Sequence, residues 1–238
     1  MRKWLAILML LAGGIAPRIP EGFELPACWV SFDGVTMAPA EPQVSVLSSS
    51  ASELVLRILT PGVVSDSLEV ESDEYRRLSL PGYGATRDVG HPELPVIGQL
   101  VAVPLGCDIA LSTAYTESIR YWMPLVYPAP AETVRHTEDG YAYIDEVFSL
   151  DEDAYNSRGL SPDNVASAEI IGSIRGQGVA LLTVHPIRFD PEYQEIRILP
   201  SVDITLSFNG GSGGVSGDLG PLDSIARREF SRTTRDRA

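Results

Sequence analysis

The sequence predicts an all-β protein, a β-sandwich of jelly-roll or Greek-key type. The 238 residues include 21 glycines and 18 prolines, a content that favours a turn-rich β protein over a helical one. Apolar and polar residues alternate with a period of two in many short segments, and glycine, proline, aspartate or asparagine bounds each of them. With 44% hydrophobic residues, the chain can fill a substantial core.

Strand-like alternation runs through most of the chain. Residues 52–60 place Leu54, Leu56 and Ile58 on one face, and residues 202–208 alternate in the same way. Further short segments of this kind span residues 67–71, 75–80, 98–103, 108–115, 119–122, 168–176, 178–184 and 195–199. Only residues 149–157 favour a helical turn or two. The core that these strands predict contains Leu54, Leu56, Ile58, Val101, Val103, Leu182, Val184, Ile196, Ile198, Ile204 and Leu206.

Residues 90–104, GHPELPVIGQLVAVP, place prolines at both ends of an apolar run. Proline cannot donate a hydrogen bond to a β-ladder, so Pro92, Pro95 and Pro104 belong at strand ends and edges. The run between them is apolar on both faces, which fits a strand that is covered on both sides. We therefore expect an extended entry segment that leads into a buried strand.

The two ends of the chain differ from its middle. Residues 1–16 combine Arg2 and Lys3 with a short apolar stretch and small residues, the features of an export signal that is too short to span a bilayer comfortably. We expect a secreted protein without a membrane anchor once the signal is removed. Residues 17–41 lack periodicity and predict a flexible lead-in, residues 42–209 form the sandwich, and residues 210–238 form a Gly/Ser and Arg-rich linker.

The charge distribution argues against two classes of partner. The net charge is −14, and because residues 1–18 and residues 227–238 each carry +3, the residues between them carry −20. A body this acidic repels nucleic acid and anionic lipid, so neither is an expected partner. The charge fits either a solvated surface or recognition of a basic partner.

The residues supply no catalytic set, metal site or cofactor site. The three histidines share no metal-ligand spacing, and Asp151 and Asp153 fit no standard Ca²⁺ loop. Cys28 and Cys107 either form a disulfide in an oxidising compartment, which would stabilise the fold by about 4 kcal/mol, or are two unrelated thiols. By itself the chain is not expected to be an enzyme.

Two blocks of the sequence resemble one known family. GHPELPVIGQLVAVP is similar to the Gly-x-Pro-x-Leu-Pro segment of the N-terminal propeptide of gingipains, which are secreted cysteine peptidases of the caspase-like clan. Residues 174–199, IRGQGVALLTVHPIRFDPEYQEIRIL, resemble the Arg-Gly-Gln, strand, Pro-x-x-aromatic-x-Pro, strand order of the same family. Residues 42–58 resemble its first hairpin more weakly. The resemblance covers about residues 42–209.

The resemblance implies a β-sandwich prodomain that assists folding of a caspase-like cysteine peptidase domain and holds it latent until cleavage. That domain would be the partner and would contain the catalytic Cys and His, so no residue here inherits them. Cleavage after arginine is implied, and the candidate processing residues in the linker are Arg228, Arg232, Arg235 and Arg237.

The family also implies that a basic side chain on a prodomain loop enters the specificity pocket of the peptidase. The matching segment here is residues 128–140, whose only arginine is Arg135. Thr133 and Val134 favour the extended backbone that a protease cleft accepts. Arg120 is the runner-up, but its segment reads as a strand that directs the side chain to solvent. The alternative for Arg135 is an ordinary surface residue in a turn.

A function from another class remains open. The chain would then be a free-standing secreted sandwich that binds a ligand or surface, as an adhesin module does, and its Arg-rich end would be a simple terminus. A small secreted hydrolase is a third possibility, which fails for want of a catalytic set.

Overall fold

The computed structural model describes residues 28–115, 118–123, 125–137, 139–174, 176–211 and 220–221. The predicted signal peptide, residues 1–16, lies outside this part of the chain. So do the four arginines that the sequence analysis proposes as processing sites, all of which follow residue 221.

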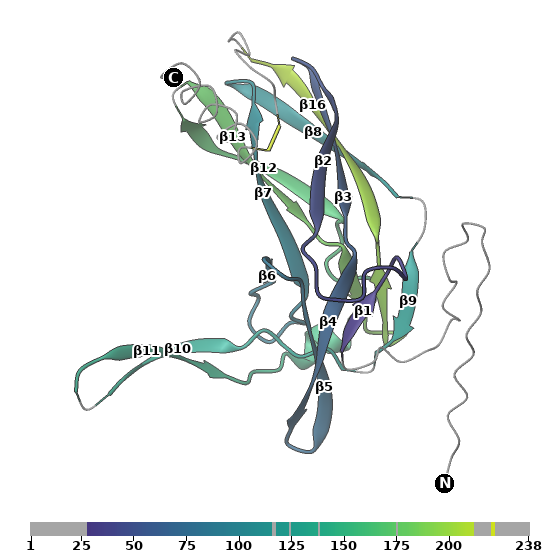
Figure 1. The fold of residues 1–238 in the computed structure, drawn as a ribbon. Helices are drawn as coiled ribbons and strands as arrows, with labels where there is room; N and C mark the ends of the chain where they lie inside the picture. The colour runs from purple at the N-terminus through teal and green to yellow at the C-terminus, as the bar shows by residue number, and fades with distance from the viewer. Residues whose placement is uncertain are drawn as a thin grey trace, which may run out of the picture.

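Two four-stranded antiparallel sheets face each other and form the sandwich (Figure 1). The first has the order β2 (Gln43–Ser49), β3 (Glu53–Leu59), β16 (Ser201–Gly210), β8 (Cys107–Ala114). The second has the order β12 (Ala166–Ile174), β13 (Gln177–Val184), β7 (Pro95–Val103), β6 (Gly84–Ala85). The last long strand, β16, lies between β3 and β8, so strands from distant parts of the chain are neighbours in this sheet.

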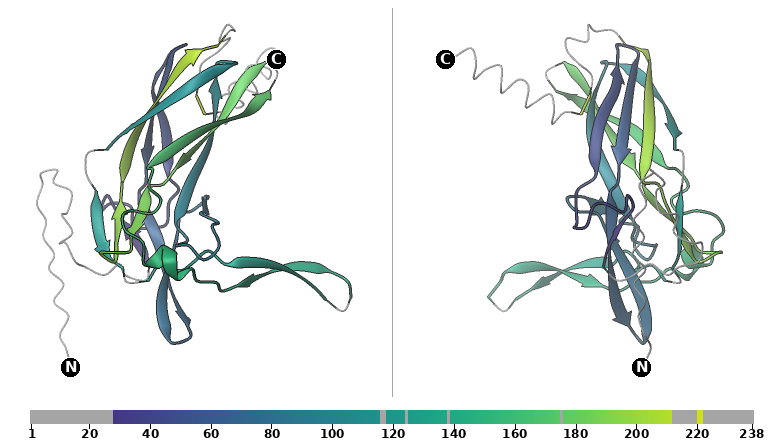
Figure 2. Two further views of the ribbon diagram at one scale, coloured as in Figure 1. Left: turned by 180° about the vertical axis from the view of Figure 1, so that it is seen from behind. Right: turned by 45° about the vertical axis from the view of Figure 1, so that its right-hand side comes forward.

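Smaller sheets continue the sandwich at its lower end (Figures 1 and 2). One consists of β1 (Trp29–Ser31), β4 (Gly62–Val70) and β5 (Asp73–Ser79), and another of β14 (Ile187–Asp190), β15 (Glu195–Ile198) and β9 (Ile119–Trp122). A separate pair consists of β10 (Ala131–His136) and β11 (Ala142–Val147), and the short helix α1 (Glu152–Tyr155) follows it.

Prolines mark the joints between the upper and lower sheets. Pro61 separates β3 from β4, Pro186 separates β13 from β14, and Pro200 separates β15 from β16. Because proline has no N–H to donate, pairing stops at each of these positions. The joints are connected to one another, since Thr60 donates its backbone N–H to the Pro200 carbonyl and Leu199 donates to the Pro186 carbonyl, both at 2.8 Å.

The structure confirms the predicted fold class and core. All eleven residues predicted for the core are exposed by 1% or less and belong to one continuous hydrophobic cluster. They meet in register, with Leu54 opposite Leu206 and Leu56 opposite Ile204. The helical turn predicted within residues 149–157 is α1. Such burial is the main favourable contribution to folding.

The sequence predicts that residues 17–41 form a flexible lead-in, but the described part of this segment is structured. From Cys28 onward it is part of the fold, because β1 pairs with β4 and places Val30 and Phe32 in the core. The following turn closes on Asp33: backbone N–H groups of Thr36 and Val35 and the hydroxyls of Ser31 and Thr36 donate to its carboxylate. These hydrogen bonds, first among them the one from the Thr36 backbone, hold the pKa of Asp33 well below its usual value. A three-residue strand is too short to show alternation in the sequence.

Part of the predicted linker, residues 210–238, also contacts the sandwich. β13 pairs along one edge of β7, whereas β6 covers only Pro95 and Val96 on the other. The upper part of that second edge therefore has backbone groups that need a partner. Gly220 and Pro221 are buried there, where the Ala102 N–H donates to the Gly220 carbonyl at 3.0 Å and Pro221 bridges Val101. Contacts with the sandwich therefore continue beyond the predicted boundary at residue 210, because Gly220 and Pro221 pack against β7.

This attachment can be broken by one substitution. Gly220 is buried and a Cβ on it would lie 3.5 Å from Val46 Cγ2, so Gly220→Asp places a carboxylate at a buried position beside an apolar methyl group. We expect faster hydrogen exchange at the Ala102 amide and a free energy of unfolding lower by about 1–2 kcal/mol. Gly84→Asp is the matched control, because a Cβ there meets no atom within 4 Å. Equal behaviour of the two variants would contradict the attachment.

The half-buried His185 predicts a pH dependence of the free energy of unfolding. Burial, and then the positive charge of Arg188, lower the pKa of His185 below its ordinary 6.5. The unfolded chain therefore binds the proton more readily, and the free energy of unfolding should decrease as the pH falls below about 6.5, by at most about 1.4 kcal/mol per pH unit. Urea titrations between pH 7 and 5 measure this slope. His185→Gln should reduce this slope, and an unchanged slope in His185→Gln would refute the assignment.

Candidate functional site

The hairpin of β10 and β11 projects away from the sandwich, as Figures 1 and 2 show. Its strands pair with each other from Ala131 opposite Val147 to His136 opposite Ala142, and no other described strand pairs with them. The turn closes through the Thr137 N–H, which donates to the Tyr141 carbonyl, and Gly140 adopts a φ of 84°, a value that favours glycine. The hairpin is thus a regular two-stranded arm.

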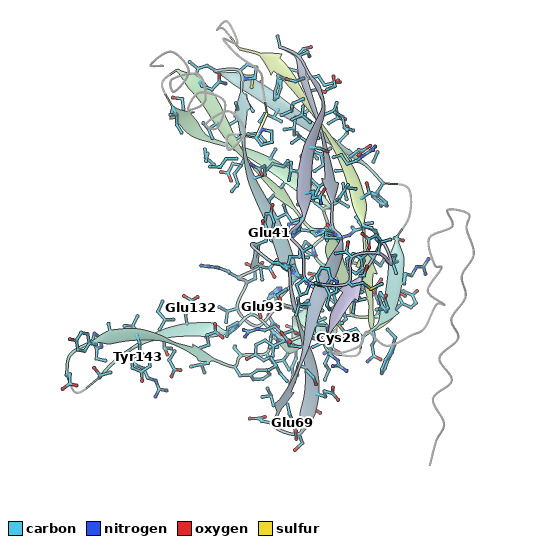
Figure 3. All side chains as sticks on the ribbon, viewed as in Figure 1. Cys28, Glu41, Glu69, Glu93, Glu132 and Tyr143 are labelled. Carbon is cyan, nitrogen blue, oxygen red and sulfur yellow. The ribbon has the colours of Figure 1, made fainter. Side chains whose placement is uncertain are left out.

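The arm exposes apolar side chains on a face that nothing in the described structure covers. Val134 and Ile144 lie directly opposite each other and are 65% and 64% exposed, and Tyr141 is exposed at the turn. Figure 3 shows the arm with Glu132 and Tyr143 labelled on it. Large apolar side chains that gather on a protruding element are typical of a surface that contacts a partner. Sequence reasoning missed this face, because residues 131–136 and 142–147 do not alternate between apolar and polar side chains.

Arg135 lies on β10 near the tip of this arm, opposite Tyr143. The structure confirms the extended backbone that Thr133 and Val134 predicted, but it places the residue in a strand and not in a loop. Its side chain is 61% exposed, and its Nε lies 2.7 Å from Asp145 Oδ2. An exposed pair of this kind contributes about 0.2–1 kcal/mol, so the guanidinium can exchange this partner for another. Arg120 is exposed on β9, as expected.

The two cysteines are free thiols and do not form the possible disulfide. Cys28 is exposed at the lower end of the molecule, where its carbonyl accepts a hydrogen bond from the Ser65 N–H (Figure 3). Cys107 is buried at the other end, where it begins β8 opposite Gly210, and burial raises the pKa of its thiol. Of the two alternatives for these residues, the structure has the two separate thiols.

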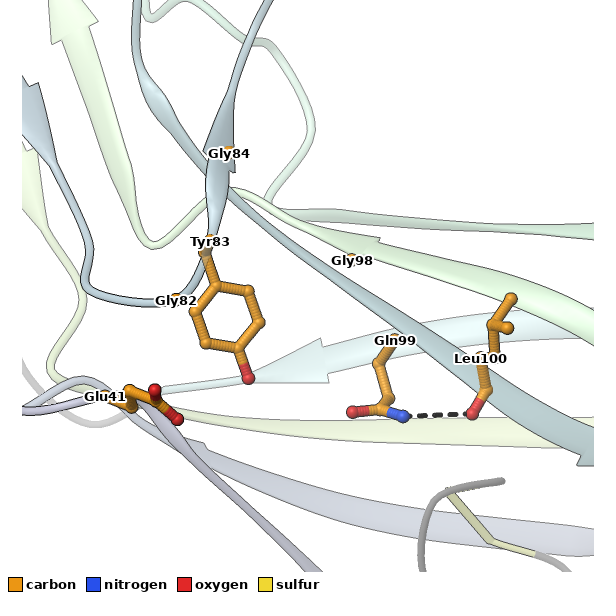
Figure 4. Close-up of a pocket in the computed structure, with 7 residues that line it drawn as sticks. All are labelled: Glu41, Gly82, Tyr83, Gly84, Gly98, Gln99 and Leu100. Atoms are coloured by element: carbon orange, nitrogen blue, oxygen red, sulfur yellow. Dashed lines mark hydrogen bonds between the residues drawn. The ribbon is translucent and has the colours of Figure 1, made fainter. Parts of the chain in front are cut away.

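Other candidate sites have structural roles or lack the groups that chemistry needs. The Asp151 carboxylate caps α1 by accepting from the Asp153 and Ala154 N–H groups. An open recess beside β6 and β7 is lined by Glu41, Gly82, Tyr83, Gly84, Gly98, Gln99 and Leu100 (Figure 4). Its one carboxylate has no nucleophile or second acid beside it. Within the described ranges, no three His, Cys, Asp or Glu side chains gather as metal ligands.

The part of the chain that the structure describes contains no helix long and apolar enough to cross a membrane.

Known relatives share this sequence in part. Lys-gingipain HG66 and Lys-gingipain W83, both from Porphyromonas gingivalis, are 25% identical over 148 residues, which is 60% of this chain. The chain is much shorter than these relatives, because the alignment spans 8% of the length of each.

Two solved structures share the fold. One, on the zymogenic latency of gingipain K from Porphyromonas gingivalis, superposes with a TM-score of 0.58 and 19% identity over 77% of this chain and all of the other. The second is a complex of the pro- and mature domains of RgpB from the same organism, with a TM-score of 0.63 and 14% identity over 74% of this chain and 91% of the other. These structures are similar to this chain in fold.

The family itself follows from a broader match. The sequence model of Propeptide_C25 covers residues 36–232, which includes the whole sandwich, the hairpin and the attached segment at Gly220 and Pro221. The chain belongs to the Propeptide_C25 family.

Proposed function

We propose that this chain is the non-catalytic prodomain of a secreted, gingipain-like cysteine peptidase and keeps that peptidase latent until proteolysis removes it. The exposed hairpin that carries Arg135 is the observation on which the proposal rests most. The family match and the similarity to structures of gingipain prodomains support it. The signal-like residues 1–16 agree with export of the precursor.

In the proposed mechanism, the hairpin enters the active-site cleft and Arg135 leaves Asp145 for a carboxylate in the specificity pocket. Charge-assisted, bidentate hydrogen bonds of arginine are strong and directional, and a buried arginine often dominates an interface. The backbone of Arg135 is already paired with β11. Its peptide bond therefore lacks the freedom of an extended substrate, which explains how the arm can occupy a cleft without being cut.

The sandwich and the tether complete the inhibition. Burial of an interface on the order of 1,600 Å² between the sandwich and the peptidase would hold the two together. A short tether keeps the prodomain at an effective concentration of about millimolar, so even a modest interface stays closed until the tether is cut. Because Gly220 and Pro221 are attached to β7, we place the start of this tether at Pro221. A preformed sandwich could also assist folding of the peptidase by presenting a surface against which it assembles.

Removal of the arginine side chain tests the inhibitory contact. Arg135→Ala should weaken inhibition of the cognate peptidase domain by about 2–4 kcal/mol, because a buried anchor in the pocket is lost. The measurement is the inhibition constant of the added chain. Arg120→Ala, an exposed arginine on β9, is the matched control and should inhibit as the native chain does. An unchanged constant in Arg135→Ala would remove this residue from the mechanism.

Limited proteolysis tests the proposed processing of the Arg-rich end of the chain. An Arg-specific peptidase, added briefly to the chain, should cut after Arg228, Arg232, Arg235 or Arg237 before it cuts the sandwich, because a Gly/Ser-rich and polar tail is the preferred site of proteolysis. Intact-mass spectrometry over a time course identifies the first products. First cuts within residues 43–210 would refute the assignment of the tail as the processing site.

A further inference from the structure

We propose that Arg77 sets the direction in which the hairpin projects, and that it thereby acts as a positioning residue for inhibition. The proposal rests on the proposed function, because Arg77 can affect inhibition only if the hairpin contacts the peptidase. Its structural part concerns only contacts within this chain. A two-stranded hairpin without a third strand is marginally stable alone, so its orientation depends on how its base is held.

The segment that precedes β7 lies between the two ends of the hairpin. Gly90 donates its N–H to the Ala129 carbonyl and accepts from the Asp151 N–H, at 2.9 and 3.0 Å, while Ala129 donates to the His91 carbonyl at 2.8 Å. Ala129 leads into β10 and Asp151 follows β11. Gly90 has a φ of 83°, and a Cβ there would lie 2.9 Å from the Asp151 nitrogen, so the close approach requires glycine.

Arg77 connects this base to the arm itself. It lies on β5, and its Nε donates to Glu93 Oε2 at 2.7 Å while its Nη2 donates to Glu146 Oε2 at 3.1 Å. Glu93 belongs to the segment before β7, and Glu146 is the second-last residue of β11. The guanidinium also lies over the ring of Tyr127, with Cζ 4.6 Å from the ring centroid. One side chain therefore joins three separate parts of the chain.

Backbone hydrogen bonds also hold the base, among them Tyr127 N–H to the Arg76 carbonyl and Glu93 N–H to the Tyr127 carbonyl, both at 2.8 Å, but the other side-chain packing there is less directional. Tyr75, Tyr127 and Phe148 pack edge to face with centroids 5.4–6.2 Å apart, and the Tyr155 hydroxyl donates to the Val126 carbonyl at 2.6 Å. Aromatic packing tolerates small rotations, whereas a guanidinium that donates to two carboxylates in different elements has a defined geometry. The Glu93 side chain is only 17% exposed, so water competes only weakly for the ion pair of Arg77 and Glu93.

The consequence is a preorganised arm. If only a fraction of free molecules held the hairpin in the binding orientation, the apparent affinity would fall by that fraction. Arg77 raises the fraction without touching the peptidase. Loss of Arg77 should therefore slow association and leave dissociation unchanged, whereas loss of a contact residue acts mainly on dissociation.

The first experiment measures the orientation of the hairpin relative to the sandwich in the chain alone. Spin labels at Ser45 on β2 and at Asp139 in the hairpin turn, introduced as non-canonical residues so that both cysteines stay native, report the distance distribution by pulsed electron paramagnetic resonance. We expect a narrow distribution in the native chain and a broad one in Arg77→Ala. Arg57→Ala is the matched control, since Arg57 makes an equally close two-point pair with Asp203 inside the first sheet, with both hydrogen bonds at 2.7 Å.

A second variant keeps the test decisive if Arg77→Ala unfolds. Glu146→Gln removes only the charge on the arm, and it should broaden the distribution partially. A distribution as narrow as the native one in Glu146→Gln and in any folded Arg77→Ala protein would overturn the proposal, as would equal broadening in Arg57→Ala.

The second experiment measures inhibition of the cognate peptidase domain. Arg77→Ala should lower the association rate constant by about tenfold, because two partly exposed ion pairs and a cation–π contact together favour the binding orientation by about that factor. The dissociation rate constant should stay unchanged. An effect confined to dissociation would refute a positioning role. If the native chain does not inhibit at all, the proposed function fails, and the distance distributions still decide whether Arg77 orients the arm.

Discussion

Enclosure of β7 between prolines is the constraint on which the rest of the structure depends. Pro95 is the first residue of β7 and Pro104 follows its last, and between them β13 takes one edge of the strand while β6 and Gly220 share the other. The inward residues of β7 fill the core, and the residues just before it hold the base of the hairpin. The stretch GHPELPVIGQLVAVP thus connects the core, the projecting arm and the attached tail, which explains why an apolar strand is preceded by a polar, proline-rich entry.

This arrangement separates a rigid part from an exposed part. The sandwich buries its apolar residues in one continuous cluster, so its shape resists deformation. The arm buries little, and its contribution lies in what it presents: Arg135 on one face, and Val134 with Ile144 on the other. In the proposed prodomain, such a division would keep the shape of the sandwich constant while the arm remains available to a partner.

Sequence reasoning succeeded where strands are long and half-buried. The eleven core residues lie on strands of at least four residues, in which period-two alternation is visible. It failed for β1 and β6, which have three and two residues, and for β10 and β11, whose apolar side chains are exposed and so carry no signal of burial. The attachment of Gly220 could not be predicted, because it depends on an edge of β7 that only the assembled sheet leaves open. The extended backbone at Arg135 was predictable from Thr133 and Val134, whereas its pairing with Asp145 required the hairpin register.

The central claim is that the arm occupies the active-site cleft of a cysteine peptidase. Competition tests it most directly, with a peptidase whose catalytic cysteine is covalently blocked by a peptidyl inhibitor that fills the specificity pocket. Binding of this chain to the blocked and the free enzyme is then compared by surface plasmon resonance. The account predicts that the blocked enzyme binds the chain far more weakly. Equal affinity for the two forms would show that the chain binds elsewhere or only covers the enzyme from outside, and would contradict it.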